Sequence, residues 1–161
     1  MAMALYGYSL QVYADFSGYT DMAIGVALLF GYRLPQNFNS PYKADSCGNF
    51  WRRWHMSLSG WLKDYLYIPL GGNRHGITRM YAALMITMLL GGLWHGASWN
   101  FVVWGGLHGV ALMVHKMWRG EKKRDDHRLN PLSILVTFHF VCLTWVFFRA
   151  ADFGIAWNVI S

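Results

Sequence analysis

His95 is the residue whose type and neighbours best suit proton-transfer chemistry. Glycines flank it at Gly92 and Gly96, and they leave room for a substrate to approach the imidazole. An imidazole can take a proton from a hydroxyl near neutral pH, because its unperturbed pKa of about 6.5 lies close to the working pH. The alternative is a structural histidine that hydrogen-bonds a neighbouring helix. We treat His95 as a candidate general base.

A second histidine, His55, follows two arginines in a tryptophan-rich segment. In the functional interpretation His55 lies at the mouth of a cavity, and Arg52 and Arg53 bind an anionic group such as a cofactor phosphate. In the alternative, the segment is a helix at the membrane surface, and its arginines extend toward water. The residues alone favour this alternative.

Asp15 and Asp21 lie within one long apolar run. A charge at the centre of a membrane helix costs about 2.5–3.5 kcal/mol on insertion scales, so such residues usually face a protein interior or a wet cavity. The two carboxylates could carry a proton relay or bind a substrate hydroxyl. Pairing with an arginine of another helix is an equally good interpretation.

The remaining sequence patterns give little indication of other cofactor sites or catalytic motifs. His95 and His108 are 13 residues apart, a spacing that could place two haem ligands at different depths. Cys47 and Cys142 lack metal-ligand spacing and are predicted to be free thiols. No Gly-x-Ser-x-Gly elbow, P-loop, HExxH or GxGxxG motif occurs. Acyl transfer, if this is the reaction, would then be direct and promoted by a base.

The composition indicates that these residues are held by membrane helices. Of the 161 residues 55% are hydrophobic and 14% are charged, against about 25% charged in typical soluble proteins. So few charges cannot cover the large relative surface of a small globule, whereas a lipid-facing surface needs none. The net charge of +6 comes from basic residues between apolar runs. This pattern is typical of cytoplasmic loops, and we expect no nucleic-acid partner.

The chain is predicted to be all-α, with polytopic transmembrane helices. Residues 4–34 are long enough to cross a bilayer, as one span or as two shorter segments, and contain small-xxx-small spacings at Ala14/Gly18 and Ala27/Gly31. Residues 49–68 are predicted to form an amphipathic interfacial helix. Further spans are expected at 97–118 and 132–148, with a basic cytoplasmic loop at 116–128.

The segment before His95 is predicted to be a broken or re-entrant helix. Its apolar run, residues 80–94, is 15 residues long and ends near Gly91 and Gly92. A helix of that length reaches about 22 Å, short of a hydrocarbon core of about 30 Å. Because both chain ends lie in apolar sequence, we expect residues 1–161 to be a partial transmembrane domain, truncated at both ends and without a separate soluble domain.

Four segments resemble the membrane-bound O-acyltransferase family, in its alginate O-acetylation branch. They are residues 13–25, 50–59, 64–74 and 91–100, in the family's order. Proteins that transfer D-alanine to teichoic acid look similar over the two histidine motifs. The stretch 68–74 favours the alginate-type branch.

The resemblance implies a fold of many helices in the inner (cytoplasmic) membrane, with a tunnel through a thinned core. It implies that His95 is the catalytic histidine and His55 the second. We further expect Arg52 and Arg53 to hold the phosphates of the donor, and Trp94, Asn100 and Asp15 to contact donor or acceptor. Acetyl-CoA or another cytosolic thioester is the expected donor substrate, with no bound cofactor and no metal. The expected partners are membrane lipid, an extracytoplasmic acetyltransferase and a polysaccharide acceptor. D-alanyl transfer and a non-enzymatic haem-binding or transport subunit remain the alternatives.

Overall fold

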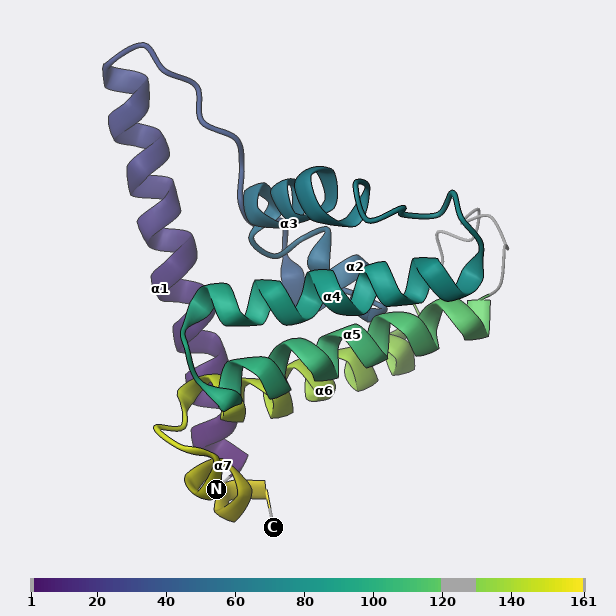
Figure 1. The fold of residues 1–161 in the computed structure, drawn as a ribbon. Coiled ribbons are helices and arrows are strands. Elements are labelled where there is room, and N and C mark those ends of the chain that lie inside the picture. The colour runs from purple at the N-terminus through teal and green to yellow at the C-terminus, as the bar shows by residue number, and fades with distance from the viewer. Residues whose placement is uncertain (1, 120–129, 161) are drawn as a thin grey trace.

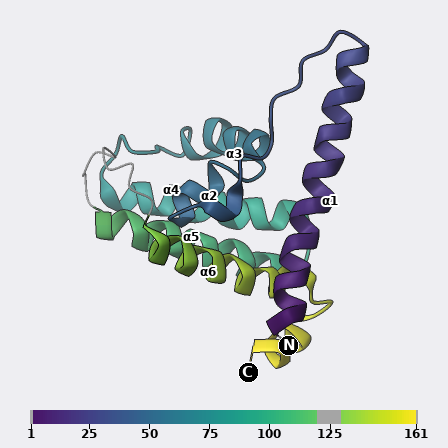
Figure 2. The same ribbon diagram turned by 180° about the vertical axis from the view of Figure 1, so that it is seen from behind.

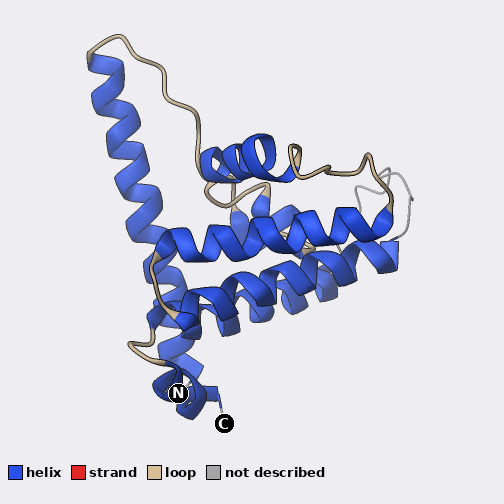
Figure 3. Ribbon diagram, in the orientation of Figure 1, coloured by secondary structure: helices blue, strands red, loops and turns tan. Residues whose placement is uncertain are grey.

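The computed structural model describes residues 2–119 and 130–160, and all regular elements in these residues are helical (Figures 1 and 3). The all-α prediction is therefore confirmed for the described part of the chain. Most of the basic segment predicted as a cytoplasmic loop, residues 120–128, lies outside the described residues.

Helix α1 (Ala2–Leu29) is one continuous helix of 28 residues rather than two shorter segments. Its N-terminal half lies beside α6 (Pro131–Arg149) and α7 (Phe153–Ile160), and its C-terminal half extends beyond the other helices (Figures 1 and 2). The loop after α1, residues 30–40, then returns to the body of the molecule (Figure 3).

Helices α4 (Ile77–His95), α5 (Trp99–Arg119) and α6 lie side by side and cross α1 (Figures 1 and 2). The predicted break before His95 is wrong, because α4 runs through Gly91 and Gly92 and has His95 as its last residue. The glycine at 92 instead permits close helix packing, since a Cβ there would overlap the carbonyl oxygen of Phe101 on α5.

Two helices in the described residues, α4 and α6, are long and apolar enough to cross a membrane. The prediction that the segment before His95 is too short was wrong, because α4 begins at Ile77 and has 19 residues. The predicted helices at 97–118 and 132–148 correspond closely to α5 and α6. That residues 4–34 and 97–118 cross a membrane stays a prediction.

The predicted interfacial helix at 49–68 is not one helix. The segment contains α2 (Cys47–Trp51), α3 (Met56–Leu62) and the π-helical turn η2 (Lys63–Tyr67), after a short 3-10 turn η1 (Pro41–Lys43). The break falls at His55, whose backbone is left-handed with a φ of 42°. The core beneath α2 is aromatic, and its largest buried side chains include Phe50, Trp104 and Trp145.

Candidate active site

The two predicted catalytic histidines line the same cavity. It has a volume of about 270 Å³, and His55 and His95 are the only titratable side chains among the described residues that line it. The remaining lining side chains are apolar or aromatic: Val12, Phe16, Trp54, Trp94, Trp104, Trp145 and Phe148. The cavity thus brings together residues from α1, the α2–α3 turn, α4, α5 and α6.

His95 is held at the end of α4 by aromatic rings from two other helices. The Trp104 ring centroid lies 5.3 Å from the imidazole centroid with the planes at 87°, and the Phe148 centroid lies at 5.2 Å with the planes at 74°. Such edge-to-face contacts restrict ring rotation without occupying a ring nitrogen. The side chain is only half-buried, so a reactant entering the cavity could reach it.

His55 enters the cavity from the turn between α2 and α3. Its imidazole packs edge-on against Phe16, with centroids 4.8 Å apart, and lies 6.3 Å from the ring of Trp94. Burial lowers the pKa of His55 from its usual value, because a low-dielectric environment disfavours the charged form. The ring is therefore neutral at neutral pH.

The loop after α1 fixes the left-handed backbone at His55. This conformation costs a non-glycine residue about 1–2 kcal/mol, so the flanking residues must hold it. On one side, the Met56 amide donates to the Asn37 carbonyl at 3.0 Å. On the other, the Asn39 amide donates to the Arg53 carbonyl at 2.9 Å, and Arg53 Nη1 donates to the Asn39 carbonyl at 3.0 Å. Because these bonds lie on both sides of His55, they set the direction of its imidazole.

His108 serves a structural network behind the cavity. The indole Nε1 of Trp51 donates to His108 Nδ1 at 3.3 Å, so Nδ1 accepts and the ring proton is on Nε2. Nε2 donates to the Thr144 hydroxyl at 3.0 Å, which in turn donates to the Val141 carbonyl at 2.8 Å. Both ring nitrogens are occupied within the protein. This arrangement argues against the haem hypothesis, which needs a free nitrogen on His108 as well as on His95.

Neither cysteine is placed to act as a nucleophile. Cys47 is buried with its Sγ 3.6 Å from His108 Nδ1, and burial raises the pKa of this thiol to about 12. A thiol protonated at neutral pH is unreactive. Cys142 is a buried free thiol on α6, as predicted from the sequence, and it does not line the histidine cavity.

Of three other predicted site residues, one lines the histidine cavity and two do not. Trp94 lines the cavity. Asn100 does not: it is buried, and its Nδ2 donates to the Ala150 carbonyl at 2.8 Å, which ties the start of α5 to the end of α6. Asp15 is exposed on α1 and outside the cavity. The predicted binding roles of Asn100 and Asp15 therefore gain no support from their positions.

The two arginines also differ. Arg53 uses its Nε to donate to Asn49 Oδ1 at 3.2 Å and its Nη1 to bond the loop after α1, so its guanidinium has a structural task. Arg52 caps α2 and its side chain is exposed. Because its side chain is the more exposed of the two, Arg52 is the better placed to meet a molecule arriving from outside.

Sequence reasoning missed most of the cavity wall. Trp104, Trp145 and Phe148 come from α5 and α6, outside the segments around the two histidines. Their apolar character predicts burial but does not predict which cavity they line. Trp54, next to His55, is the wall residue that the sequence could have indicated.

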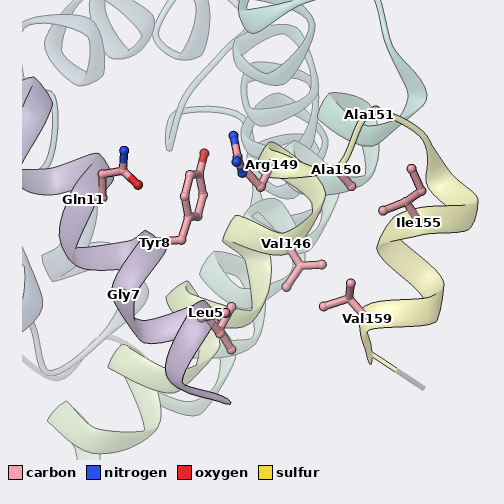
Figure 4. A pocket seen from close by; sticks show the side chains of 11 residues that line it. Leu5, Gly7, Tyr8, Gln11, Val146, Arg149, Ala150, Ala151, Ile155 and Val159 are labelled. Atoms are coloured by element: carbon pink, nitrogen blue, oxygen red, sulfur yellow. The ribbon is translucent and has the colours of Figure 1, made fainter. Parts of the chain in front are cut away.

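A larger cavity, of about 650 Å³, lies elsewhere, between α1, α6 and α7 (Figure 4). Its walls are mostly apolar, and the guanidinium of Arg149 lies over the ring of Tyr8, 5.3 Å from the ring centroid. No histidine or carboxylate in the described residues lines it. Its size therefore does not make it the better candidate for acyl-transfer chemistry.

The histidine cavity has the features of a proton-transfer site. Two imidazoles line a space whose other walls are apolar side chains, and electrostatic interactions are stronger beside such walls than in water. No cluster of metal-binding side chains occurs within residues 2–119 and 130–160. The arrangement suits base-promoted attack of a hydroxyl on an acyl donor.

Comparison with known proteins agrees with this chemistry. The model of the membrane-bound O-acyltransferase family matches residues 1–149. The chain is 52% identical, over 99% of its length, to the peptidoglycan O-acetyltransferase of Helicobacter pylori, and 49% identical, over 94%, to the probable alginate O-acetylase AlgI of Pseudomonas aeruginosa. It is 32% identical, over 92%, to the teichoic acid D-alanyltransferase of Bacillus subtilis.

The chain spans only part of these relatives, namely 30% of the first, 29% of the second and 41% of the third. The match nevertheless covers both histidine motifs and nearly all of the described helices. The apolar helices and the family match together indicate a membrane protein. On this evidence the chain belongs to the membrane-bound O-acyltransferase family.

Proposed function

We propose that the full-length protein containing this chain transfers an acetyl group from a cytosolic thioester, such as acetyl-CoA, toward an extracytoplasmic polysaccharide hydroxyl or a partner protein. The observation that carries the proposal is the shared cavity of His55 and His95 at the end of α4, a helix able to cross a membrane. A cavity bordered by helices that can cross a membrane suits a reaction between reactants that arrive from opposite faces of a bilayer. The residues belong to a multi-pass protein of the inner membrane in this proposal.

His95 acts as the general base. It takes the proton from the acceptor hydroxyl as the oxygen attacks the thioester carbonyl, so the new C–O bond forms while the proton moves to the imidazole. The tetrahedral intermediate then collapses, the C–S bond breaks, and the imidazolium returns its proton to the leaving thiolate. Close placement of donor and acceptor in the narrow cavity supplies much of the rate.

His55 assists this reaction from the turn between α2 and α3. Its neutral imidazole can donate a hydrogen bond to the carbonyl oxygen as negative charge develops there. Trp94, between the two histidines, supplies an apolar surface for the acyl group. Arg52 and, less directly, Arg53 attract the phosphates of the donor. Where the acceptor is a partner protein, that protein is a separate extracytoplasmic acetyltransferase, which then places the acetyl group on the polysaccharide.

Replacing His55 with glycine is expected to lower kcat by at least about tenfold, since one hydrogen bond to the developing oxyanion can contribute up to 10²–10³ in rate. Glycine is the informative change because it tolerates the left-handed backbone that His55 adopts and carries no side-chain donor. His55→Ala adds backbone strain to the loss of the ring, and it should also lower the melting temperature. Initial rates of labelled acetyl transfer in proteoliposomes provide the measurement. A fully active His55→Gly protein would reduce His55 to a structural role.

D-alanyl transfer is the second candidate, favoured by the identity to the teichoic acid D-alanyltransferase. The two reactions differ in donor, because the second needs an acyl group delivered by a carrier protein. Assaying acetyl-CoA and a D-alanyl carrier protein side by side with the same membranes separates them. Turnover with the carrier protein and none with acetyl-CoA would replace the acetyl proposal by the D-alanyl one.

A further inference from the structure

A second cleft, lined by polar side chains, lies beside the histidine cavity. Its volume is about 260 Å³, and apart from Phe38 its lining residues are polar, among them Tyr13, Asp21, Gln36 and Ser40. Helix α1 supplies one wall and the loop 30–40 supplies the other. Polar groups gathered in this way, in a chain with 14% charged residues, indicate a polar occupant.

Several polar groups of the cleft are available to an occupant. The carboxylate of Asp21, the amides of Gln36 and Asn39, and the hydroxyl of Ser40 make no side-chain hydrogen bond with other described residues. A carboxylate only accepts hydrogen bonds, an amide both donates and accepts, and a hydroxyl does either. This mixture matches the ring hydroxyls of a sugar, each of which can donate one hydrogen bond and accept others.

Two aromatic side chains, packed one against the other, separate the cleft from His55. Phe38 lines the cleft, and its ring centroid lies 5.0 Å from that of Phe16, which lines the histidine cavity. Phe16 in turn packs against His55 at 4.8 Å. The Phe38 and Phe16 rings therefore form the wall between a molecule seated in the cleft and the histidine cavity.

The cleft is also bonded directly to the turn that carries His55. Asn37 lines the cleft, and its Oδ1 accepts from the Ser57 amide at 3.1 Å and from the Ser57 hydroxyl at 2.6 Å. Asn39 exchanges backbone and guanidinium hydrogen bonds with Arg53. An occupant that orders this loop thus orders both flanks of His55.

We propose that this polar cleft binds one sugar unit of a hydroxyl-rich acyl acceptor and holds it beside the histidine cavity. The inference rests on the proposed acyl-transfer function. The cleft volume, slightly below the roughly 300–1,000 Å³ of typical ligand pockets, suits about one sugar ring. Asp21 is the chief anchor, because hydrogen bonds to a charged group are the stronger ones.

The test uses the full-length protein in proteoliposomes, with a peptidoglycan disaccharide and an alginate trisaccharide as probes. Asp21→Asn and Gln36→Ala, on opposite walls, are each expected to raise the Kd and the acceptor KM for the preferred probe by about tenfold. The KM for acetyl-CoA and the kcat should stay within about twofold. Tryptophan fluorescence reports binding, and labelled acetyl reports transfer.

Asp152→Asn is the matched control. Asp152 is exposed, directly precedes α7 near the N-terminal end of α1 (Figure 1), and does not line the cleft. Asparagine can still accept the hydrogen bond from the Ile155 amide, which is 2.8 Å long here. This variant should leave every constant unchanged.

The outcomes separate this inference from the proposed function. Normal acceptor KM in both cleft variants, with transfer intact, would overturn the cleft and leave the acyltransferase proposal standing. A wild-type protein that binds a probe but transfers no acetyl, together with loss of that binding in both cleft variants, would support the cleft and refute the transfer. No binding of either probe to wild type would overturn the cleft.

Discussion

Replacing His95 with alanine in the full-length protein is expected to abolish acyl transfer while leaving membrane insertion and folding intact. General acid–base catalysis by one positioned side chain contributes about 10²–10⁴ in rate, and no other base lines the cavity among the described residues except His55. His95 is the last residue of α4, and its side chain is half-buried at the cavity. Truncating this side chain to alanine therefore leaves the interior of the helix unchanged. The measurement is labelled acetyl transfer by membranes that contain equal amounts of each protein.

His75→Ala is the matched control for this experiment, because His75 is exposed and lies outside the histidine cavity. It should retain wild-type transfer. Size-exclusion profiles in detergent should be the same for wild type, His75→Ala and His95→Ala. Near-normal acetylation by His95→Ala would remove the imidazole from the mechanism and end the proposal.

The helices beside the site could be predicted because their signals are local. Residues 132–148 form an apolar run, and Asn130 followed by Pro131 marks its start. In the structure Asn130 Oδ1 accepts from the Leu132 amide at 3.0 Å, and α6 begins at Pro131. Run length and capping residues act over a few positions, so they are readable without the rest of the fold.

The break at His55 could not be predicted in the same way. The spacing of apolar residues through 49–68 is helical, and no glycine or proline interrupts it at 55. The break comes from Asn37 and Asn39, which bond to Met56 and Arg53 from about 15–20 residues upstream. Tertiary hydrogen bonds of this kind override local helix preference.

In the candidate site, too, local sequence indicated some features, whereas others depend on tertiary packing. Glycines and local composition indicated His95, and the resemblance to known proteins indicated both histidines. That they share a cavity depends on how α2 and α4 pack against the aromatic core, and rings such as Trp145 and Phe148 come from a helix that begins 36 residues after His95. Periodicity places a residue on a helix face but does not name the partner of that face.

The contact between α4 and α5 gives the second prediction with a large expected effect. Gly92 and Gly105 face each other across it, and a Cβ on either would lie 3.4 Å from the Cα of the other. Each new Cβ would also overlap a backbone carbonyl, that of Phe101 for Gly92 and that of Met88 for Gly105. Small residues at such positions let membrane helices approach closely. The glycines of the predicted small-xxx-small pairs, Gly18 on α1 and Gly31 just after it, make no such contact in the described part of the chain, since a Cβ at either would meet nothing within 4 Å.

Gly92→Ala and Gly105→Ala should therefore each destabilise the protein, by about 1–3 kcal/mol or more, because backbone atoms cannot move aside as a flexible side chain can. Thermal unfolding in detergent is the measurement, and transfer activity should fall as well, since Gly92 lies three residues before His95. Gly25→Ala is the control: a Cβ there has open space in α1, and alanine favours the helix, so its melting temperature should not fall.

The double variant distinguishes a shared backbone contact from two unrelated defects. If both methyl groups force apart the same pair of helices, the separation that accommodates the first also accommodates part of the second. The loss in unfolding free energy for Gly92→Ala with Gly105→Ala should then be clearly smaller than the sum of the two single losses, as expected for neighbours in contact. Losses that add fully would mean that the two glycines act at independent places. A melting temperature unchanged in both single variants would mean that α4 and α5 do not approach as closely as Gly92 and Gly105 allow, and the position of His95 at the end of α4 would lose its structural basis.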